Sequence, residues 1–216
     1  FEYFEIDGFT TGAIGGIIVD EETLQPLNGV TVHMFNGLIS YLTDDFGNGF
    51  YAFHDLPPGD YEVTAFKAGY DTLRFIAEVQ ANEPTFLDIS MRTDTPPFVD
   101  ASRPKSDESG VDVHENILLR FTRPMDLSTL ETGFSVSPDL NGQMSLNSQK
   151  KILTFVPDTP LHFGERYTIT IDQSAKDIYG HPFDGNGDGI EGDAYVLNFQ
   201  TVPLDTTYPL VMETWP

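Results

Sequence analysis

The sequence contains no cysteine. Disulfide bonds, thiol nucleophiles and cysteine-ligated zinc sites are therefore excluded, although this absence does not assign the protein to a compartment. There is also no run of about 18 apolar residues, the length that indicates a membrane-spanning helix. We therefore expect no insertion into a membrane.

Basic residues are scarce, because 11 Lys and Arg stand against 34 Asp and Glu, for a formal net charge of −23. A surface this negative repels the phosphates of nucleic acids and of anionic membranes, so we expect no nucleic-acid partner. It attracts cations instead. Two explanations remain open: the charge serves solubility or a saline habitat, or it reflects several sites for divalent ions.

Catalytic signatures are missing as well. The five histidines stand at none of the spacings that build a metal-binding face, and no HExxH, Gly-x-Ser-x-Gly or phosphate-binding glycine loop is present. The many acidic residues always offer carboxylate pairs of the kind that glycosidases use, but a substrate cleft needs a larger architecture than two small sandwiches. We expect that the protein is not an enzyme.

The chain does contain many short segments that are apolar or alternate between apolar and polar residues, separated by 15 Pro and 19 Gly. They predict strands at 13–19, 29–35, 39–43, 50–53, 61–66, 86–91, 116–121, 152–157, 166–171 and 194–201. Asn36-Gly37 lies between two of them and is a strong signal for a hairpin turn. Only 125–130 suggests a helical turn, so the sequence predicts an all-β fold.

Two Pro-rich segments begin alike, one at Asp94-Thr95 and the other at Asp205-Thr206. Their separation is roughly 110 residues, the size of one sandwich domain. We therefore predict two tandem β-sandwich domains at 11–92 and 95–203, with 204–216 as a linker or the start of a further module. Chance similarity between two linkers is the alternative. The first residues carry no basic region or cleavage signature, so we expect an internal segment of a longer protein.

A series of motifs runs through the first domain in a fixed order. They are Gly16 to Val19, Gln25 to Val32, Thr43-Asp44-Asp45-Phe46-Gly47, Phe50-Tyr51-Ala52-Phe53, Leu56-Pro57-Pro58-Gly59-Asp60-Tyr61-Glu62-Val63 and Lys67-Ala68-Gly69-Tyr70. Together they resemble the carboxypeptidase regulatory-like domain, a transthyretin-like sandwich. The resemblance implies an accessory domain without zinc ligands or peptidase activity. Gly47-Asn48-Gly49 departs from the family by lengthening one turn.

The second domain carries a different series. It comprises Phe121-Thr122-Arg123-Pro124-Met125-Asp126, Ser128-Thr129-Leu130, Leu153-Thr154-Phe155-Val156-Pro157, Tyr167-Thr168-Ile169-Thr170-Ile171, the segment from Lys176 to Phe183, and Phe199-Gln200-Thr201. This half resembles the bacterial Ig-like domains of S-layer and other surface proteins. Such domains mainly serve as spacers, which is what the resemblance implies about function.

The richest candidate site is the loop from Asp184 to Asp193. Oxygen-bearing side chains at loop positions 1, 3 and 5 (Asp184, Asn186, Asp188), a glycine at 6 and a carbonyl at 7 (Ile190) are typical of a loop that wraps a calcium ion. Asp193 would supply a further carboxylate. The loop differs from an EF-hand, because position 12 is a tyrosine and a strand follows.

We therefore predict a structural Ca²⁺ site with Asp184, Asn186, Asp188, Ile190 and Asp193 as ligands, and Mg²⁺ fits a flexible cage of carboxylates less well. Asp177 would add an oxygen if the loop folds back. An acidic turn without metal is the alternative. A second oxygen-rich turn at Asp44 to Asn48 is better explained by backbone capping than by a cation.

Altogether the sequence predicts a non-catalytic structural or adhesive spacer in a large secreted or cell-surface bacterial protein. The alternative is a carbohydrate-binding or accessory module attached to an extracellular enzyme or uptake system. Partners would be surface glycans or other surface proteins, and the fragment itself is expected to be monomeric. Aromatic side chains that could stack on sugars are more often core residues; the candidates are Tyr41, Tyr51, Tyr61, Tyr70, Tyr179 and Tyr208.

Overall fold

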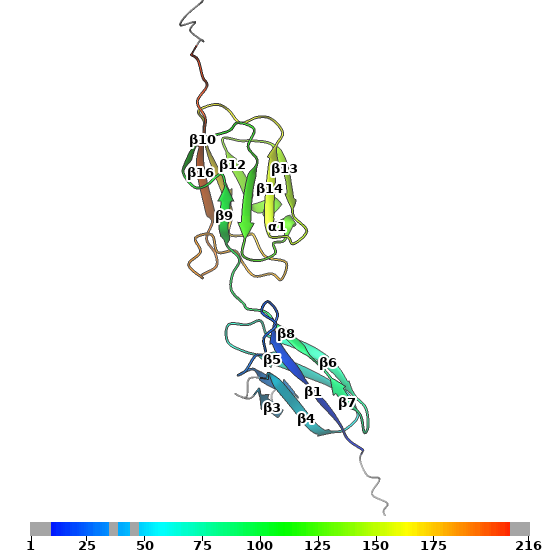
Figure 1. The fold of residues 1–216 in the computed structure, drawn as a ribbon. Coiled ribbons are helices and arrows are strands. Elements are labelled where there is room, and N and C mark those ends of the chain that lie inside the picture. Colours follow the sequence, from blue (N-terminus) through cyan, green and yellow to red (C-terminus); the bar gives the residue numbers. More distant parts are fainter. Residues whose placement is uncertain (1–9, 35–38, 44–47, 208–216) are drawn as a thin grey trace, which may run out of the picture. The chain divides into compact units, whose positions relative to one another are not determined.

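The computed structural model describes residues 10–34, 39–43 and 48–207. It divides into two compact units, the first ending at Thr95 and the second beginning at Pro96 (Figure 1). Each unit is built from two four-stranded sheets, so the predicted all-β class is confirmed. None of the helices in these three ranges has the length and apolar character needed to cross a bilayer.

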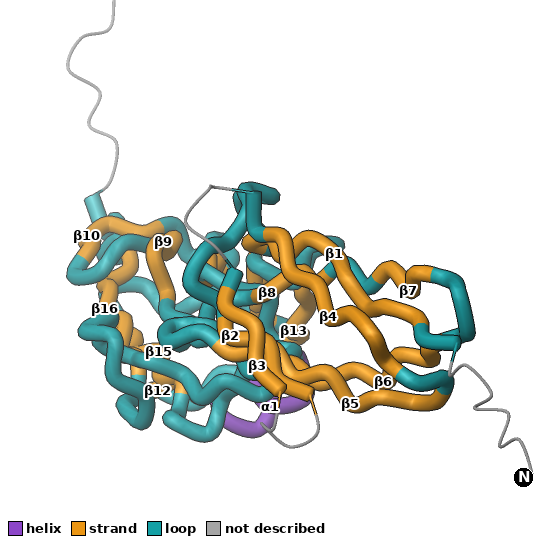
Figure 2. The backbone as a smooth tube through the Cα atoms, turned by 90° about the horizontal axis from the view of Figure 1, so that it is seen from below, coloured by secondary structure: helices purple, strands orange, loops and turns teal. Residues whose placement is uncertain are grey.

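Unit 1 has one sheet in the order β4-β1-β7, with β8 also pairing with β1, and a second sheet in the order β3-β2-β5-β6. The strands are β1 (Gly12–Asp20), β2 (Thr31–Met34), β3 (Ile39–Leu42), β4 (Phe50–Leu56), β5 (Gly59–Phe66), β6 (Leu73–Val79), β7 (Pro84–Phe86) and β8 (Ile89–Met91). Figure 2 shows β1 between β4 and β7.

The core of unit 1 follows from the alternation of its strands. Ile14 and Ile18 of β1 are fully buried, while Ile17 between them is exposed, because successive side chains of a strand point to opposite faces. Val32 of β2 and Val63 of β5 approach them from the other sheet and are also fully buried. These residues belong to one continuous apolar cluster between the two sheets.

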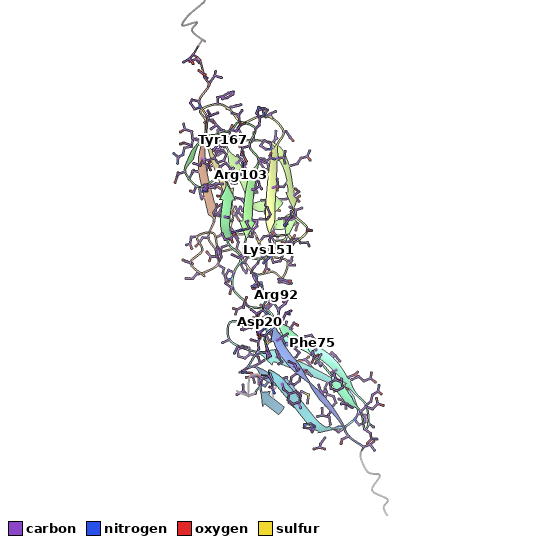
Figure 3. The ribbon with its side chains drawn as sticks, viewed as in Figure 1. Asp20, Phe75, Arg92, Arg103, Lys151 and Tyr167 are labelled. Carbon is purple, nitrogen blue, oxygen red and sulfur yellow. The ribbon has the colours of Figure 1, made fainter. Side chains whose placement is uncertain are left out.

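Two parts of unit 1 differ from the prediction. The expected strand 86–91 is split into β7 and β8, which both run parallel to β1. The split occurs where the backbone of Leu87 crosses Gly16 so closely that a Cβ at Gly16 would lie 2.2 Å from the Leu87 carbonyl oxygen. Strand β6, which contains Phe75 (Figure 3), was missed although its apolar residues alternate.

Unit 2 pairs a sheet in the order β10-β16-β15-β12 with one in the order β13-β14-β11-β9. The strands are β9 (Val99–Arg103), β10 (Glu108–Val111), β11 (Ile117–Phe121), β12 (Phe134–Ser137), β13 (Gly142–Leu146), β14 (Ile152–Pro157), β15 (Arg166–Ile171) and β16 (Tyr195–Thr201). The predicted strands 152–157 and 166–171 coincide with β14 and β15. In the core, Tyr167 stacks on Phe199 with ring centroids 5.6 Å apart.

The helical turn expected at 125–130 is a short helix, α1 (Leu127–Gly133), shifted towards the C-terminus. The side chain of Asp126 fixes its start by accepting a hydrogen bond from the backbone N–H of Ser128 at 3.0 Å. Leu130 is the buried residue that packs α1 against the core. The cap therefore explains why the helix begins two residues later than predicted.

Candidate metal centre

The loop from Asp184 to Asp193 lies in the long connection between β15 and β16 and is anchored by a core residue. Phe183 is fully buried, and its ring lies edge-on to that of Phe121, with centroids 6.2 Å apart. The carbonyl of Phe183 accepts a hydrogen bond from the N–H of Gly192 at 2.9 Å, which closes the loop. Asp184 therefore enters the loop from the core and is only 1% exposed.

The carboxylate of Asp184 organises the backbone around it. Its Oδ1 accepts a hydrogen bond from the N–H of Gly187 at 2.7 Å, and its Oδ2 accepts one from the N–H of Gly189 at 2.8 Å. Both glycines have positive φ angles, 77° and 89°, which residues with a Cβ rarely adopt. The glycine spacing in the sequence thus serves to wrap the chain around one carboxylate.

Two further polar residues continue the wrapping. The side-chain oxygen of Asn186 accepts a hydrogen bond from the N–H of Asp188, and Oδ1 of Asp188 accepts one from the N–H of Ile190, both at 2.8 Å. The amide of Asn186 also donates to Oδ2 of Asp188 at 3.2 Å. These contacts are successive Asx turns, the local geometry expected of Asn and Asp in tight loops.

Three carboxylates meet at the centre of the loop. Asp184, Asp188 and Asp193 each offer one oxygen, and these atoms all lie within 4.8 Å of one another. Asp184 is buried, Asp193 is partly buried and Asp188 is exposed. Three negative charges at this separation repel one another strongly unless a cation or protons neutralise them.

One atom of this group has no hydrogen-bond donor. Oδ1 of Asp193 is shielded from solvent and accepts no hydrogen bond from any described residue. Leaving a buried carboxylate oxygen without a partner is costly, so the oxygen fits a position that a cation completes. The atoms that could act as metal ligands are all hard oxygen atoms, which fits Ca²⁺ or Mg²⁺ and not a thiolate-preferring metal.

The structure thus brings together three of the five predicted ligands. The contacts found for the Asn186 side chain and for the Ile190 N–H are hydrogen bonds to other residues of the loop. The metal-ligand roles of the Asn186 oxygen and of the Ile190 carbonyl remain predictions. The turn at Asp44 to Asn48 lies largely outside the described residues. Among the tyrosines proposed for sugar stacking, Tyr51 and Tyr61 are core residues, whereas Tyr179 is exposed.

The suggestion that Asp177 joins the loop is wrong. Its side chain is fully buried and forms an ion pair with Arg123, whose Nε lies 2.9 Å from Oδ2. His181 Nδ1 lies 2.7 Å from the same oxygen, and Oδ1 accepts the backbone N–H groups of Tyr179 and His181, both at 2.9 Å. With both oxygens occupied, Asp177 has no lone pair directed at the triad.

This buried network also fixes protonation. Burial raises the pKa of Asp177, but the hydrogen bonds from the His181 ring and from the backbone of His181 and Tyr179 outweigh it, so the pKa lies below its usual value. Nδ1 of His181 lies 2.7 Å from Oδ2 of Asp177 and 3.3 Å from Nη2 of Arg123, so the ring contacts both partners of the ion pair. Sequence reasoning missed this network; Arg123 and Asp177, separated by 54 residues, give no local signal.

Comparison with known families assigns both halves of the chain. The family model of the bacterial Ig-like domain matches residues 93–201, and that of the carboxypeptidase regulatory-like domain matches residues 13–92. The order of the two domains is the one that the motifs predict. No curated protein sequence matches the chain.

Three solved structures are among those to which part of the chain is similar. They are the N-terminal part of the bacterial S-layer protein SbsC (20% identity, TM-score 0.36, covering 50% of this chain and 24% of that one), L,D-transpeptidase 1 from Mycobacterium tuberculosis (18%, 0.32, 49% and 39%) and the copper resistance protein PcoC from Escherichia coli (15%, 0.36, 49% and 98%). The chain thus spans well under two thirds of the first two proteins.

Proposed function

This chain belongs to the bacterial Ig-like domain family through residues 93–201, and on that premise we propose that it is a non-catalytic structural spacer of a secreted or cell-surface bacterial protein, stabilised by calcium. Domains of the two matched families are in general non-catalytic. Two compact sandwiches that follow one another along the chain suit a segment that separates other parts of a longer protein. The strongly acidic composition favours an environment with abundant cations.

The observation that carries the calcium proposal is the triad with its unpartnered oxygen. Asp184, Asp188 and Asp193 converge in a loop that is already wrapped by its own backbone N–H groups, and Oδ1 of Asp193 has no donor among the described residues. A bound Ca²⁺ would cancel the mutual repulsion and supply the missing partner. Calcium suits the site better than Mg²⁺ because Ca²⁺ accepts six to eight oxygen ligands in variable geometry, whereas Mg²⁺ demands a near-ideal octahedron.

The consequence of such binding is stability. An ion that binds only the folded state stabilises it by about 2.7 kcal/mol when its free concentration is a hundred times Kd. We expect unit 2 to melt at a higher temperature in calcium than in a chelator. Because the loop is part of the connection between core strands, the gain is expected in the unfolding of the whole unit and not only in local order.

Thermal melting and calorimetric titration with CaCl₂ test this proposal. Asp188→Asn is the test variant, because it keeps an oxygen acceptor for the Ile190 N–H while it removes one triad charge. Glu191→Gln is the matched control, since it removes a charge from an exposed position of the same loop that is not part of the triad. Calcium should stabilise the unaltered chain and Glu191→Gln alike, and Asp188→Asn much less.

Equal melting temperatures in calcium and chelator, with no heat of binding, would contradict the calcium proposal. A larger effect of MgCl₂ than of CaCl₂ would contradict the choice of ion. Specific binding of the chain to a glycan would argue against a pure spacer.

A further inference from the structure

The outer face of the sheet β4-β1-β7 in unit 1 is apolar. A sheet that faces water on one side normally alternates apolar and polar residues, with the polar ones outside. Here the outward side chains include Phe86, Ile17 and Phe50, which are 81%, 44% and 43% exposed. They border a trough of about 370 Å³ on the surface of the sheet. This surface, termed the β1 face, takes no part in the metal loop, which belongs to unit 2.

Strand pairing gives the β1 face a defined arrangement. Gly15 of β1 is paired with Ala52 of β4 on one side and with Phe86 of β7 on the other. One step along the same face, Ile17 is paired with Phe50. Small residues therefore form the floor of the trough, and the large apolar side chains stand at its border.

Two corners of the β1 face carry polar side chains, a histidine at one and a carboxylate at the other. At one end of the trough, Ala13 is paired with Pro84, and the exposed His54 of β4 lies at the same level, beyond Phe53. At the other end, Oδ1 of Asp88 accepts the backbone N–H of Ile17 at 2.8 Å. Among the described residues that line the trough, Asp88 is the acidic one and His54 the histidine, and they stand at diagonally opposite corners.

We propose that the β1 face binds the same face of a second copy of this chain. A two-fold axis that lies in the interface, along the diagonal from the Phe50 corner to the Pro84 corner, makes the face complementary to itself. It sets Asp88 of each copy opposite His54 of the second copy, so that the interface contains this acid–histidine contact twice. Such an interface is isologous, the commonest kind in homodimers.

The same operation matches large side chains with small ones. Phe86 of one copy lies opposite Ala13 of the second, and Ile17 opposite Ala52. The two sheets then cross at a steep angle, which is one of the two regular ways in which sheets pack face to face. Other in-plane axes give a poorer match; an axis perpendicular to the strands, for example, sets Asp88 opposite Pro84.

The charge of the protein explains why the contact between two copies is weak at low salt. Each chain carries a formal net charge of −23, so two copies repel one another at a distance. The β1 face is the exception, with one acid and one histidine that pair with their counterparts. Salt screens the long-range repulsion and leaves the apolar contact, so dimerisation should become tighter as ionic strength rises.

Sedimentation velocity over a range of protein and salt concentrations tests the proposal on the full chain. We expect a monomer–dimer equilibrium that shifts towards the dimer with added NaCl. Phe86→Asp should raise the dissociation constant by about 30-fold or more, because it removes the most exposed apolar side chain of the β1 face and sets a carboxylate against apolar surface of the second copy. Ile76→Asp, at a 68% exposed position of β6 in the other sheet, is the matched control and should leave the equilibrium unchanged.

The pairing of the corners is tested by a double-mutant cycle. His54→Asp should weaken the dimer about tenfold, because it sets two carboxylates against each other. In the background Asp88→Asn, which keeps an oxygen acceptor for the Ile17 N–H, the same change should have a much smaller effect. Circular dichroism melts establish that each variant is folded.

Three results would overturn the proposal. A monomer at all concentrations and salt conditions would do so, and would restore the monomeric state that the sequence alone predicts. Equal weakening by Phe86→Asp and Ile76→Asp would show unspecific association. A monomer that loses binding of an apolar dye on Phe86→Asp would assign the β1 face to an occupant other than a second copy.

Discussion

Two acidic sites in the connection between β15 and β16 differ in how their negative charge is balanced. Asp177 is fully buried and is satisfied within the chain by Arg123, His181 and two backbone N–H groups. The triad a few residues later is wrapped by backbone N–H groups, and the interactions found for it include no basic side chain of the described part. One site carries its own cation, and the other, on the calcium proposal, receives one from solution.

This difference separates two kinds of stability. A buried ion pair is present in the folded chain under all ionic conditions, whereas a carboxylate cluster stabilises the fold only when its charge is neutralised. Asp177 holds the beginning of the connection through Arg123 near β11. On the calcium proposal, the triad determines whether the end of the connection is stable. Variants at the two sites should therefore differ in how they respond to metal.

The largest effect is expected from removing Arg123, the cation that pairs with Asp177 within the chain. Arg123→Met leaves the buried Asp177 carboxylate without its ion-pair partner and should destabilise unit 2 by about 3–5 kcal/mol. The loss should be the same in calcium and in chelator, because the Asp177 site does not depend on metal. Urea unfolding followed by circular dichroism measures it.

The double variant Arg123→Met with Asp177→Asn provides the control. Removing the second charge as well should recover part of the stability, since the cost of the single variant comes mainly from the unpaired charge. If Arg123→Met unfolded the protein only in chelator, the separation between the two sites would be wrong.

A smaller effect with a change of sign is expected at Asp193. Without metal, Asp193→Asn removes one of three repelling carboxylates and should stabilise unit 2 by about 1 kcal/mol; with calcium, it removes a ligand and should destabilise by a similar or larger amount. Melting of both proteins in calcium and in chelator measures the reversal. A variant that lowers the melting temperature equally in both conditions would show that Asp193 acts through packing alone.

Lowering the pH should reduce the contribution of the Arg123–Asp177 pair to stability. Because the pKa of Asp177 is lowered in the folded state, its contribution is fully present above the ordinary aspartate pKa of about 3.9 and is lost as pH falls through the lowered value. One such group changes the free energy of unfolding by at most about 1.4 kcal/mol per pH unit. In chelator, the free energy of unfolding should therefore fall less steeply between neutral and acidic pH for Asp177→Asn than for the unaltered chain.

The contrast between the two sites also shows what a sequence can predict. The loop was recognisable because its spacing of Asp, Asn and Gly is local, and the three acids do converge. The Arg123–Asp177 pair joins residues 54 positions apart, and only the sandwich brings them together. Asp177 was expected to add an oxygen if the loop folds back, but Arg123 and His181 already occupy its carboxylate.

The fold shows the same division. Strands β14 and β15 were predicted to the residue, β14 because it is a short apolar segment and β15 because apolar and polar residues alternate strictly along it. The break between β7 and β8 was not, because it depends on how closely Leu87 approaches Gly16 across the sheet. Likewise, the self-complementary arrangement of the β1 face follows from the register of three strands and not from any one of them.

The smallest effect is expected at the Arg120–Asp100 ion pair, whose distance is nearly the same as that of the Arg123–Asp177 pair. Arg120 Nε lies 2.8 Å from Asp100 Oδ1, against 2.9 Å for Arg123 and Asp177, but the side chains of Arg120 and Asp100 are 57% and 34% exposed, against 6% and 0%. In water the pair is screened and its partners are easily solvated, so Arg120→Gln should leave the urea midpoint of unit 2 unchanged. A loss comparable to that of Arg123→Met would mean that distance, and not burial, decides what an ion pair contributes here.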